Sequence, residues 1–149
     1  MKKVFLCLIV LLSCFYVNAQ EKIFSNVLFN INLRDLTRII ADRNLSNYKD
    51  VNILIDGIIT EIRIDNKNNR AEVDIVSGEW FGLDEVKMYQ VTALITDENL
   101  FSRIPKTRRD SVNEYSIVAG KKIIGIVSLV QSSADNDVRV FLKDIRIIN

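Results

Sequence analysis

The stretch Val51–Ile64, VNILIDGIITEIRI, decides how the rest of the chain can fold. Its apolar residues stand at odd positions as far as Ile55 and at even positions from Ile58 onward, with Gly57 where the phase changes. Successive side chains of a strand point to opposite faces, so a phase change at a glycine predicts a bulge or sharp bend there. A long bent strand can belong to two sheets at once, which is how small barrels turn their corners. The stretch therefore predicts a small β-barrel.

Four more segments have the pattern of strands, so the chain is predicted to be mainly β. Turn-forming residues at 65–69 precede a second strand, in which apolar and charged residues alternate from Arg70 to Ile75. The third strand is expected at 86–95, after a break at 77–85. The fourth and fifth strands are expected at 123–130 and from residue 138 to the C-terminus, with a second bend near Lys143.

Two helices are expected beside these strands. Apolar residues recur at helical spacing from Leu33 to Ile40, and Asn32 and Asp35 suit the N-cap and the first turn. A helix of about two turns is expected at 97–104, followed by a long basic loop before the fourth strand. Five strands with an N-terminal helix and an extra element between strands three and four give the layout of the OB-fold, a five-stranded Greek-key barrel.

The first 20 residues, MKKVFLCLIVLLSCFYVNAQ, have the pattern of a secretory signal, with two lysines, an apolar run and small or polar residues at its end. Two processing routes are open. Cleavage after Ala19 would remove a signal peptide of residues 1–19, whereas a lipobox would remove residues 1–13 and leave a lipidated Cys14. The protein is therefore expected in the periplasm or at the envelope, with membrane attachment only if Cys14 is lipidated.

The rest of the chain is divided into a docking segment at 20–32 and an OB-fold-like domain at 33–149. Both cysteines, Cys7 and Cys14, lie in the leader, and the chain has no histidine. Disulfides, thiol or histidine catalysis and metal sites built on Cys or His are therefore excluded from the mature domain. We expect no catalytic residue, no metal and no cofactor, so the protein is not expected to be an enzyme.

The net charge of the chain is close to zero, which bears on the class of partner that it can bind. The chain has 20 basic and 19 acidic residues, and loss of Lys2 and Lys3 with the leader leaves a net charge of −1. Such a domain has no overall positive field to hold a polyanion. Together with export, this predicts that nucleic acid is not a partner and favours an envelope protein or a small ligand.

Two late segments and the first strand resemble a known family. They are NYKDVNILIDGIITEI, AGKKIIGIVSLV and VRVFLKDIRII, with Gly57 and Gly125 inside strands and Leu142, Asp144 and Ile147 near the end. In these features the chain resembles bacterial OB-fold domains similar to anticodon-binding domains (tRNA-anti-like), and more loosely the periplasmic bacterial OB-fold family. The resemblance covers residues 33–149, apart from residues 79–82 and the basic loop, and implies a binding domain without a catalytic residue.

Trp80 and Phe81 are the first candidate for a binding site. Two aromatic residues on a glycine-flanked loop beside strands two and three could stack on a base or a sugar, on the face that OB-folds use. The alternative is that they plug the barrel end or pack beneath the N-terminal helix, since large aromatic side chains are mostly buried.

Basic residues provide two further candidates. Arginine beside an aromatic ring suits nucleic acid or an anionic ligand, but the carboxylates on the same strands favour a solvated surface of mixed charge. A dense basic loop could hold anionic lipid headgroups or an acidic partner, or be solvated. The residues of the first group are Arg63, Arg70, Lys87 and Tyr89, and those of the basic loop are Lys106, Arg108 and Arg109.

The sequence thus predicts an exported, non-catalytic OB-fold module that binds a protein partner or a small ligand. The alternative is a nucleic-acid-binding or oligosaccharide-binding protein that uses the face of strands two and three. The secretion signal and the missing catalytic residues favour the first prediction, and the aromatic pair favours the second.

Overall fold

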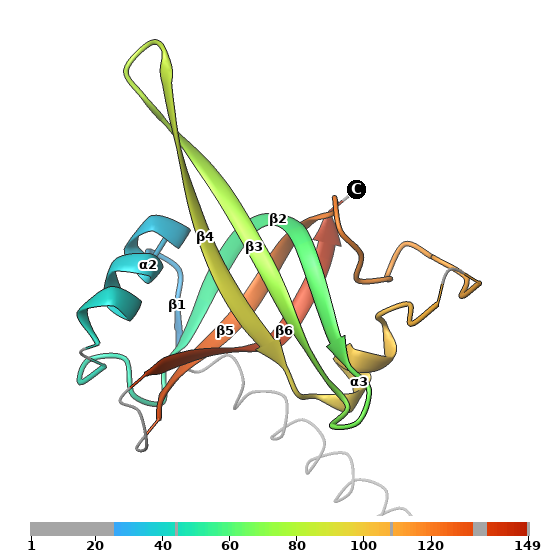
Figure 1. Cartoon of the computed structure of the whole chain (residues 1–149). Coiled ribbons are helices and arrows are strands. Elements are labelled where there is room, and N and C mark those ends of the chain that lie inside the picture. Colours follow the sequence, from blue (N-terminus) through green and yellow to red (C-terminus); the bar gives the residue numbers. More distant parts are fainter. Residues whose placement is uncertain (1–25, 44, 108, 133–136, 149) are drawn as a thin grey trace, which may run out of the picture.

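The computed structural model describes residues 26–43, 45–107, 109–132 and 137–148 (Figure 1). The predicted leader, Cys14 and Arg108 lie outside these residues. In chain order the elements are β1 (Val27–Leu28), α2 (Leu33–Asp42), β2 (Asn52–Asp65), β3 (Arg70–Phe81), β4 (Glu85–Ile95), α3 (Glu98–Ser102), β5 (Lys122–Gln131) and β6 (Val138–Ile148).

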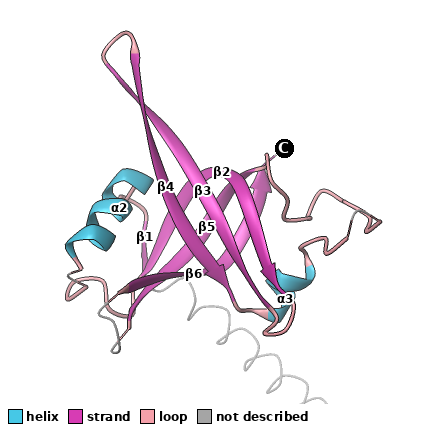
Figure 2. Ribbon diagram, viewed as in Figure 1, coloured by secondary structure: helices cyan, strands magenta, loops and turns pink. Residues whose placement is uncertain are grey.

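The strands form one sheet in the order β1-β2-β3-β4-β6-β5, and β2 also pairs with β5, which closes the sheet into a barrel (Figure 2). Pairing within the barrel is antiparallel except between β4 and β6, which run parallel at Ala93 and Val140. The short β1 lies outside the barrel and runs parallel to the start of β2. The prediction of a mainly β, five-stranded Greek-key barrel with an N-terminal helix is confirmed.

The barrel interior is filled by aliphatic side chains. Ile53, Ile55 and Ile59 of β2 are buried among the inward-facing residues of the other strands. Helix α2 packs on β4 and β2 and buries Leu33 and Leu36 in the same core, while α3 lies at the far side of the barrel (Figure 1). These contacts hold both helices against the barrel.

Both helices begin at the caps that hold their first turns. The Asn32 side-chain oxygen accepts a hydrogen bond from the Asp35 N–H at 2.9 Å, as predicted. The Asp97 carboxylate accepts from Asn99 and Leu100 at the start of α3. Among the residues that the structure describes, no helix combines the length and the hydropathy needed to cross a bilayer.

The bend in β2 lies at Thr60, beyond the predicted position at Gly57. Burial alternates without a break through Gly57, which is itself buried, and the register with β3 shifts between Ile59 and Glu61. The prediction of a bulge at Gly57 is therefore wrong, because Ile58 points outward and is not part of the core. The second predicted phase change is confirmed, since the β5–β6 register shifts where Lys143 lies.

The segment 77–85, predicted as a loop, belongs largely to two strands. Residues from Ala71 to Phe81 pair continuously with those from Ile95 to Glu85, and Gly82 adopts a φ of 69° in the turn. The second half of β2, from Ile58 onward, pairs with β3, and the first half, as far as Ile58, pairs with β5. The partner of Ile58 on β3 is Val76, so the residues of β3 after Val76 have no partner on β2. The β3–β4 hairpin therefore extends beyond the barrel, and we call residues 77–89 the arm (Figure 1).

Candidate functional site on the arm

The outer face of the arm carries apolar side chains in successive rows. Directly paired residues of antiparallel strands point to the same face, and rows two residues apart along a strand share that face. From the barrel outward, the paired residues are Ile58 with Val76, Gly78 with Met88, and Trp80 with Val86. We call these six residues the apolar strip.

Most of this strip is open to solvent. Trp80 is 74 % exposed and Met88 is 65 % exposed, and Ile58 and Val86 are each more than two-fifths exposed. Gly78 keeps the strip flat, because a Cβ there would lie 3.0 Å from the Met88 sulfur and 3.2 Å from a Val86 methyl carbon. The result is a continuous apolar surface with an indole at its outer end.

A groove of about 320 Å³ lies at the inner end of the strip, where β2 and β3 separate. Its walls are mainly apolar, and Lys122 pairs with Ile58 at its rim. The lining residues are Asp56, Gly57, Ile58, Thr60, Val76, Ser77, Gly78, Met88 and Lys122.

Beyond the inner end of the strip, away from the tip of the arm, the same outer face changes from apolar to acidic. Glu61 lies opposite Asp74, and Arg63 lies opposite Glu72 in the next row. We call Glu61, Glu72 and Asp74 the carboxylate cluster. The Asp74 side chain is 7 % exposed, and it accepts a 2.7 Å hydrogen bond from the Thr92 hydroxyl.

Arg63 is held by all three members of the carboxylate cluster. It donates to both oxygens of Asp74 at 2.8 and 2.9 Å and to Glu72 at 3.1 Å, and it forms an ion pair with Glu61 at 3.0 Å. The hydrogen bonds from Arg63 hold the pKa of Asp74 below its usual range, and those with Asp74 and Glu72 raise the pKa of Arg63. Three carboxylates around one guanidinium leave this part of the face with a net charge of −2.

The structure separates Trp80 from Phe81, because neighbouring residues of a strand point to opposite faces. The Phe81 ring lies on the α2 side, with the Lys87 ammonium 4.3 Å and the Arg34 guanidinium 5.5 Å from its centre. The two alternatives for the pair therefore apply to one residue each: Phe81 packs beside the N-terminal helix, and Trp80 is free to contact a ligand.

Contacts on this inner face fix the arm to α2. The Glu79 carboxylate accepts from the Asn32 side-chain amide at 3.0 Å and from the Arg34 guanidinium at 3.4 Å. Tyr89 is partly buried against the core. The arm therefore presents its apolar strip from a held position.

The first predicted group, which consists of three basic residues and Tyr89, does not share one face. Arg63 points outward and is held by carboxylates, and Arg70 is paired with Asp65 at 3.0 Å. Lys87 and Tyr89 point to the opposite face of the arm, since they pair with Glu79 and Ser77. The structure thus does not bring the four residues together, and their role in ligand binding stays a prediction.

In the basic loop, the described residues do not converge on one point either. The Lys106 ammonium lies 4.5 Å from the centre of the Phe101 ring, and Arg109 is exposed. Arg108 lies outside the described residues. A role for this loop in binding stays a prediction.

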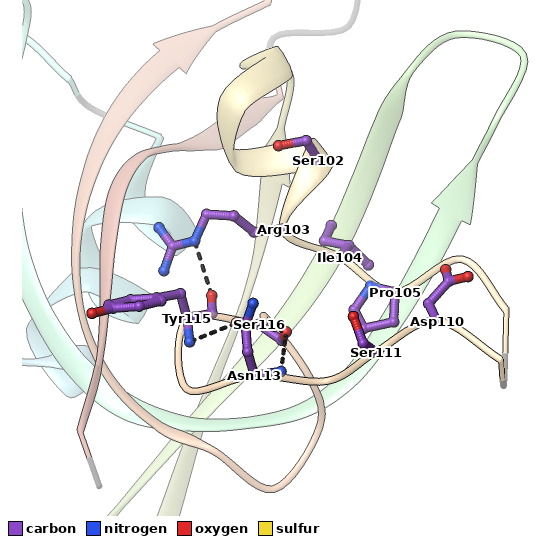
Figure 3. Close-up of a pocket in the computed structure, with 9 residues that line it drawn as sticks. All are labelled: Ser102, Arg103, Ile104, Pro105, Asp110, Ser111, Asn113, Tyr115 and Ser116. Carbon is purple, nitrogen blue, oxygen red and sulfur yellow. Dashed lines mark hydrogen bonds between the residues drawn. The ribbon is translucent and has the colours of Figure 1, made fainter.

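A second pocket, of about 450 Å³, lies between the end of α3 and the loop that follows (Figure 3). Arg103 donates to the carbonyl oxygens of Tyr115 at 2.9 Å and Ile145 at 3.1 Å, which joins the loop to β6.

Within the loop that lines this pocket, Asn113 and Ser116 hydrogen-bond to each other. The Thr107 hydroxyl and nearby N–H groups bind the Asp110 carboxylate and lower its pKa. These contacts stabilise the loop itself.

Among the described residues, no group of three or more acidic side chains is arranged to hold a metal ion. Sequence patterns did not identify Ile58, Val86 and Met88 as surface residues, because alternation assigns Ile58 to the apolar face of the first strand and because the break predicted at 77–85 hides the hairpin to which the other two belong. The signal was present: apolar or small residues alternate on both sides of the Gly82 turn, with the period of a hairpin.

Comparison with solved structures supports the same fold. The chain is similar to the yeast telomere protein Cdc13 OB4, with a TM-score of 0.50 and 10 % identity over 80 % of this chain and 87 % of that one. The fold is an OB-fold. No protein-family model and no curated protein matches the chain, so the narrower resemblance to an exported bacterial family stays a prediction.

Two further similarities are to other solved structures, with lower TM-scores. One is to the Plasmodium falciparum SSB complex with ssDNA, with a TM-score of 0.37 and 18 % identity over 66 % of this chain and 94 % of that one. The other is to the S. pombe Stn1-ten1 complex, with a TM-score of 0.38 and 14 % identity over 66 % of this chain. The chain spans 58 % of the length of that protein. Because the chain has the OB-fold, whose barrel face binds oligonucleotides in other proteins, the prediction that nucleic acid is not a partner is withdrawn.

Proposed function

We propose that this chain is a non-catalytic OB-fold module that binds single-stranded nucleic acid on the apolar strip of the arm. The observation that carries the proposal is the position of Trp80, 74 % exposed on the outer face of β3 and β4. These are the second and third strands of the barrel, whose face OB-folds use for oligonucleotides and oligosaccharides. A contiguous row of exposed apolar side chains on a small domain indicates an interaction site.

The chemistry of the strip suits the flat faces of bases. Every base has a π-face, so stacking on an indole tolerates any sequence and contributes about 1–3 kcal/mol per base. Met88 adds a polarizable thioether beside the indole, and Lys122 supplies a positive charge at the rim of the groove. Binding on such a surface relies on stacking more than on neutralised phosphates.

Trp80 is the only tryptophan in the chain, so its emission reports directly on the proposed site. Addition of a single-stranded oligonucleotide is expected to quench this emission. Replacement of Trp80 by alanine is expected to weaken binding about tenfold, in keeping with the loss of one stacked base. Fluorescence anisotropy of a labelled oligonucleotide measures the affinity of both proteins.

The control is Val130→Ala, which removes a half-exposed apolar side chain from β5, away from the strip. It is expected to bind as the unaltered protein does, and Trp80→Phe is expected to keep most of the affinity because a ring remains. An unchanged affinity in Trp80→Ala would count against the proposal. So would quenching by linear oligosaccharides and not by oligonucleotides, which would favour the glycan alternative.

We also propose that the module acts outside the cytoplasm. The support is the N-terminal pattern of two lysines, an apolar run and small residues before Gln20. Mass spectrometry of the protein from its native cells is expected to find Gln20 or a lipidated Cys14 as the first residue. Recovery of a chain that keeps residues 1–13 would contradict export.

A further inference from the structure

The apolar strip ends abruptly at the carboxylate cluster. The row of Ile58 and Val76 belongs to the strip, and the next row on the same face holds Glu61 and Asp74. Successive rows on one face of a strand pair lie about 7 Å apart along the strand, so the change from apolar to acidic takes place within the width of one nucleotide base. A ligand that lies along β3 must therefore either stop at this boundary or cross it.

The cluster repels a phosphodiester backbone because its one cation is already occupied. Arg63 directs its Nε and both terminal nitrogens to the three carboxylates. The side chains of Glu61 and Glu72 are 60 % and 49 % exposed, so their negative charges face the solvent that a bound strand would occupy. At physiological ionic strength such charges act over about 8 Å, which reaches any phosphate placed over these rows.

We propose that the carboxylate cluster is a specificity element, which keeps the phosphodiester backbone off the lower half of the outer face and confines the bound strand to the apolar strip. This inference rests on the proposed function and specifies its ligand: a short single-stranded segment of a few nucleotides. Longer strands gain no further contacts on this face, so the module does not coat nucleic acid.

Two measurable properties follow for the unaltered protein. Its affinity per binding register, after division by the number of registers that a longer strand offers, is expected to stop rising at a length of about four nucleotides, the lower end of OB-fold site sizes. Its affinity is also expected to depend weakly on salt, since each neutralised phosphate of a single strand contributes only about −0.7 to the logarithmic slope. Both properties distinguish a strip that stacks bases from a basic groove that follows a backbone.

The test is the double variant Glu61→Gln, Glu72→Gln, measured with oligothymidylates of 4 and 12 nucleotides. Both side chains are exposed, and glutamine keeps their size, so the fold is expected to persist. Removing the two charges is expected to tighten binding of the longer strand about tenfold. It is also expected to steepen the slope of log affinity against log salt by about 0.7, the contribution of one neutralised phosphate. Binding of the shorter strand is expected to change little.

The matched control is Asp42→Asn, Asp50→Asn, which removes the same charge from exposed positions outside β2, β3 and β4. Asparagine tolerates the φ of 58° at position 50. A gain that depends on length in the cluster variant but not in the control supports the inference. Equal gains in both, or a wild-type affinity per register that already rises with length, would overturn the inference and leave the proposed function intact. Loss of binding on Trp80→Ala tests that function separately, and an absence of binding in every protein would overturn both.

Discussion

Replacement of Gly57 by alanine is expected to lower the free energy of unfolding by about 3 kcal/mol, at the upper end of the cost of overpacking a core. An added Cβ would lie 2.7 Å from a methyl carbon of Ile75 and 2.9 Å from the backbone oxygen of Val76. Side chains can rotate away, but this oxygen belongs to the paired strand next to the bulge. Urea unfolding of both proteins measures the loss, with an unchanged m-value if the two states keep their compactness.

Gly125→Ala is the control, because it makes the same change in a neighbouring strand of the barrel. There the added Cβ would lie 3.1 Å from a methyl carbon of Leu142, and the nearest backbone atom is 3.5 Å away. Since a leucine side chain can move by a few tenths of an ångström, the expected loss is about 1 kcal/mol. Equal losses at the two glycines would show that the contact with the backbone of Val76 is not what restricts position 57.

The same glycine shows how far periodicity could predict this fold. The order of strands and helices, the Asn32 cap and the bend near Lys143 follow from patterns of neighbouring residues, and the structure confirms them. The position of the first bend could not be predicted, because alternation along the chain alone places Ile58 in the core. An exposed isoleucine next to a glycine imitates a phase change, and only the tertiary contacts show that Ile58 belongs to the surface.

The candidate site was harder to predict than the fold, for a related reason. The glycines on either side of Trp80 and Phe81 favour a loop with two neighbouring rings, yet in a strand two successive residues necessarily face opposite ways. Once the arm is recognised as a hairpin, the separation of the two rings follows from the sequence. Whether the Arg63 side chain is free could not be predicted, since the carboxylates that hold it come from two strands and meet only in the folded barrel.

Replacement of Arg63 by leucine is expected to lower the melting temperature at pH 7 by roughly 5–10 °C, because it leaves the carboxylate of Asp74 without its cation. The Asp74 side chain is 7 % exposed and would keep only its neutral hydrogen bonds, such as that from Thr92. Arg70→Leu is the control on the same face. Its partner Asp65 is more exposed and is bound chiefly by Asn68, so a change of at most about 2 °C is expected.

The pH dependence of this difference identifies Asp74 as its cause. In the native protein Arg63 lowers the pKa of Asp74, so the stabilisation is complete above the unfolded pKa of about 3.9 and is lost as the pH falls through the lower, folded pKa. In Arg63→Leu, burial instead raises the pKa of Asp74, and protonation on acidification relieves the unpaired charge. The difference in melting temperature between the two proteins should therefore be largest near neutral pH and should shrink below about pH 4. A difference that stays constant from pH 7 to pH 3 would mean that lost packing of the arginine side chain, and not the charge of Asp74, accounts for the effect.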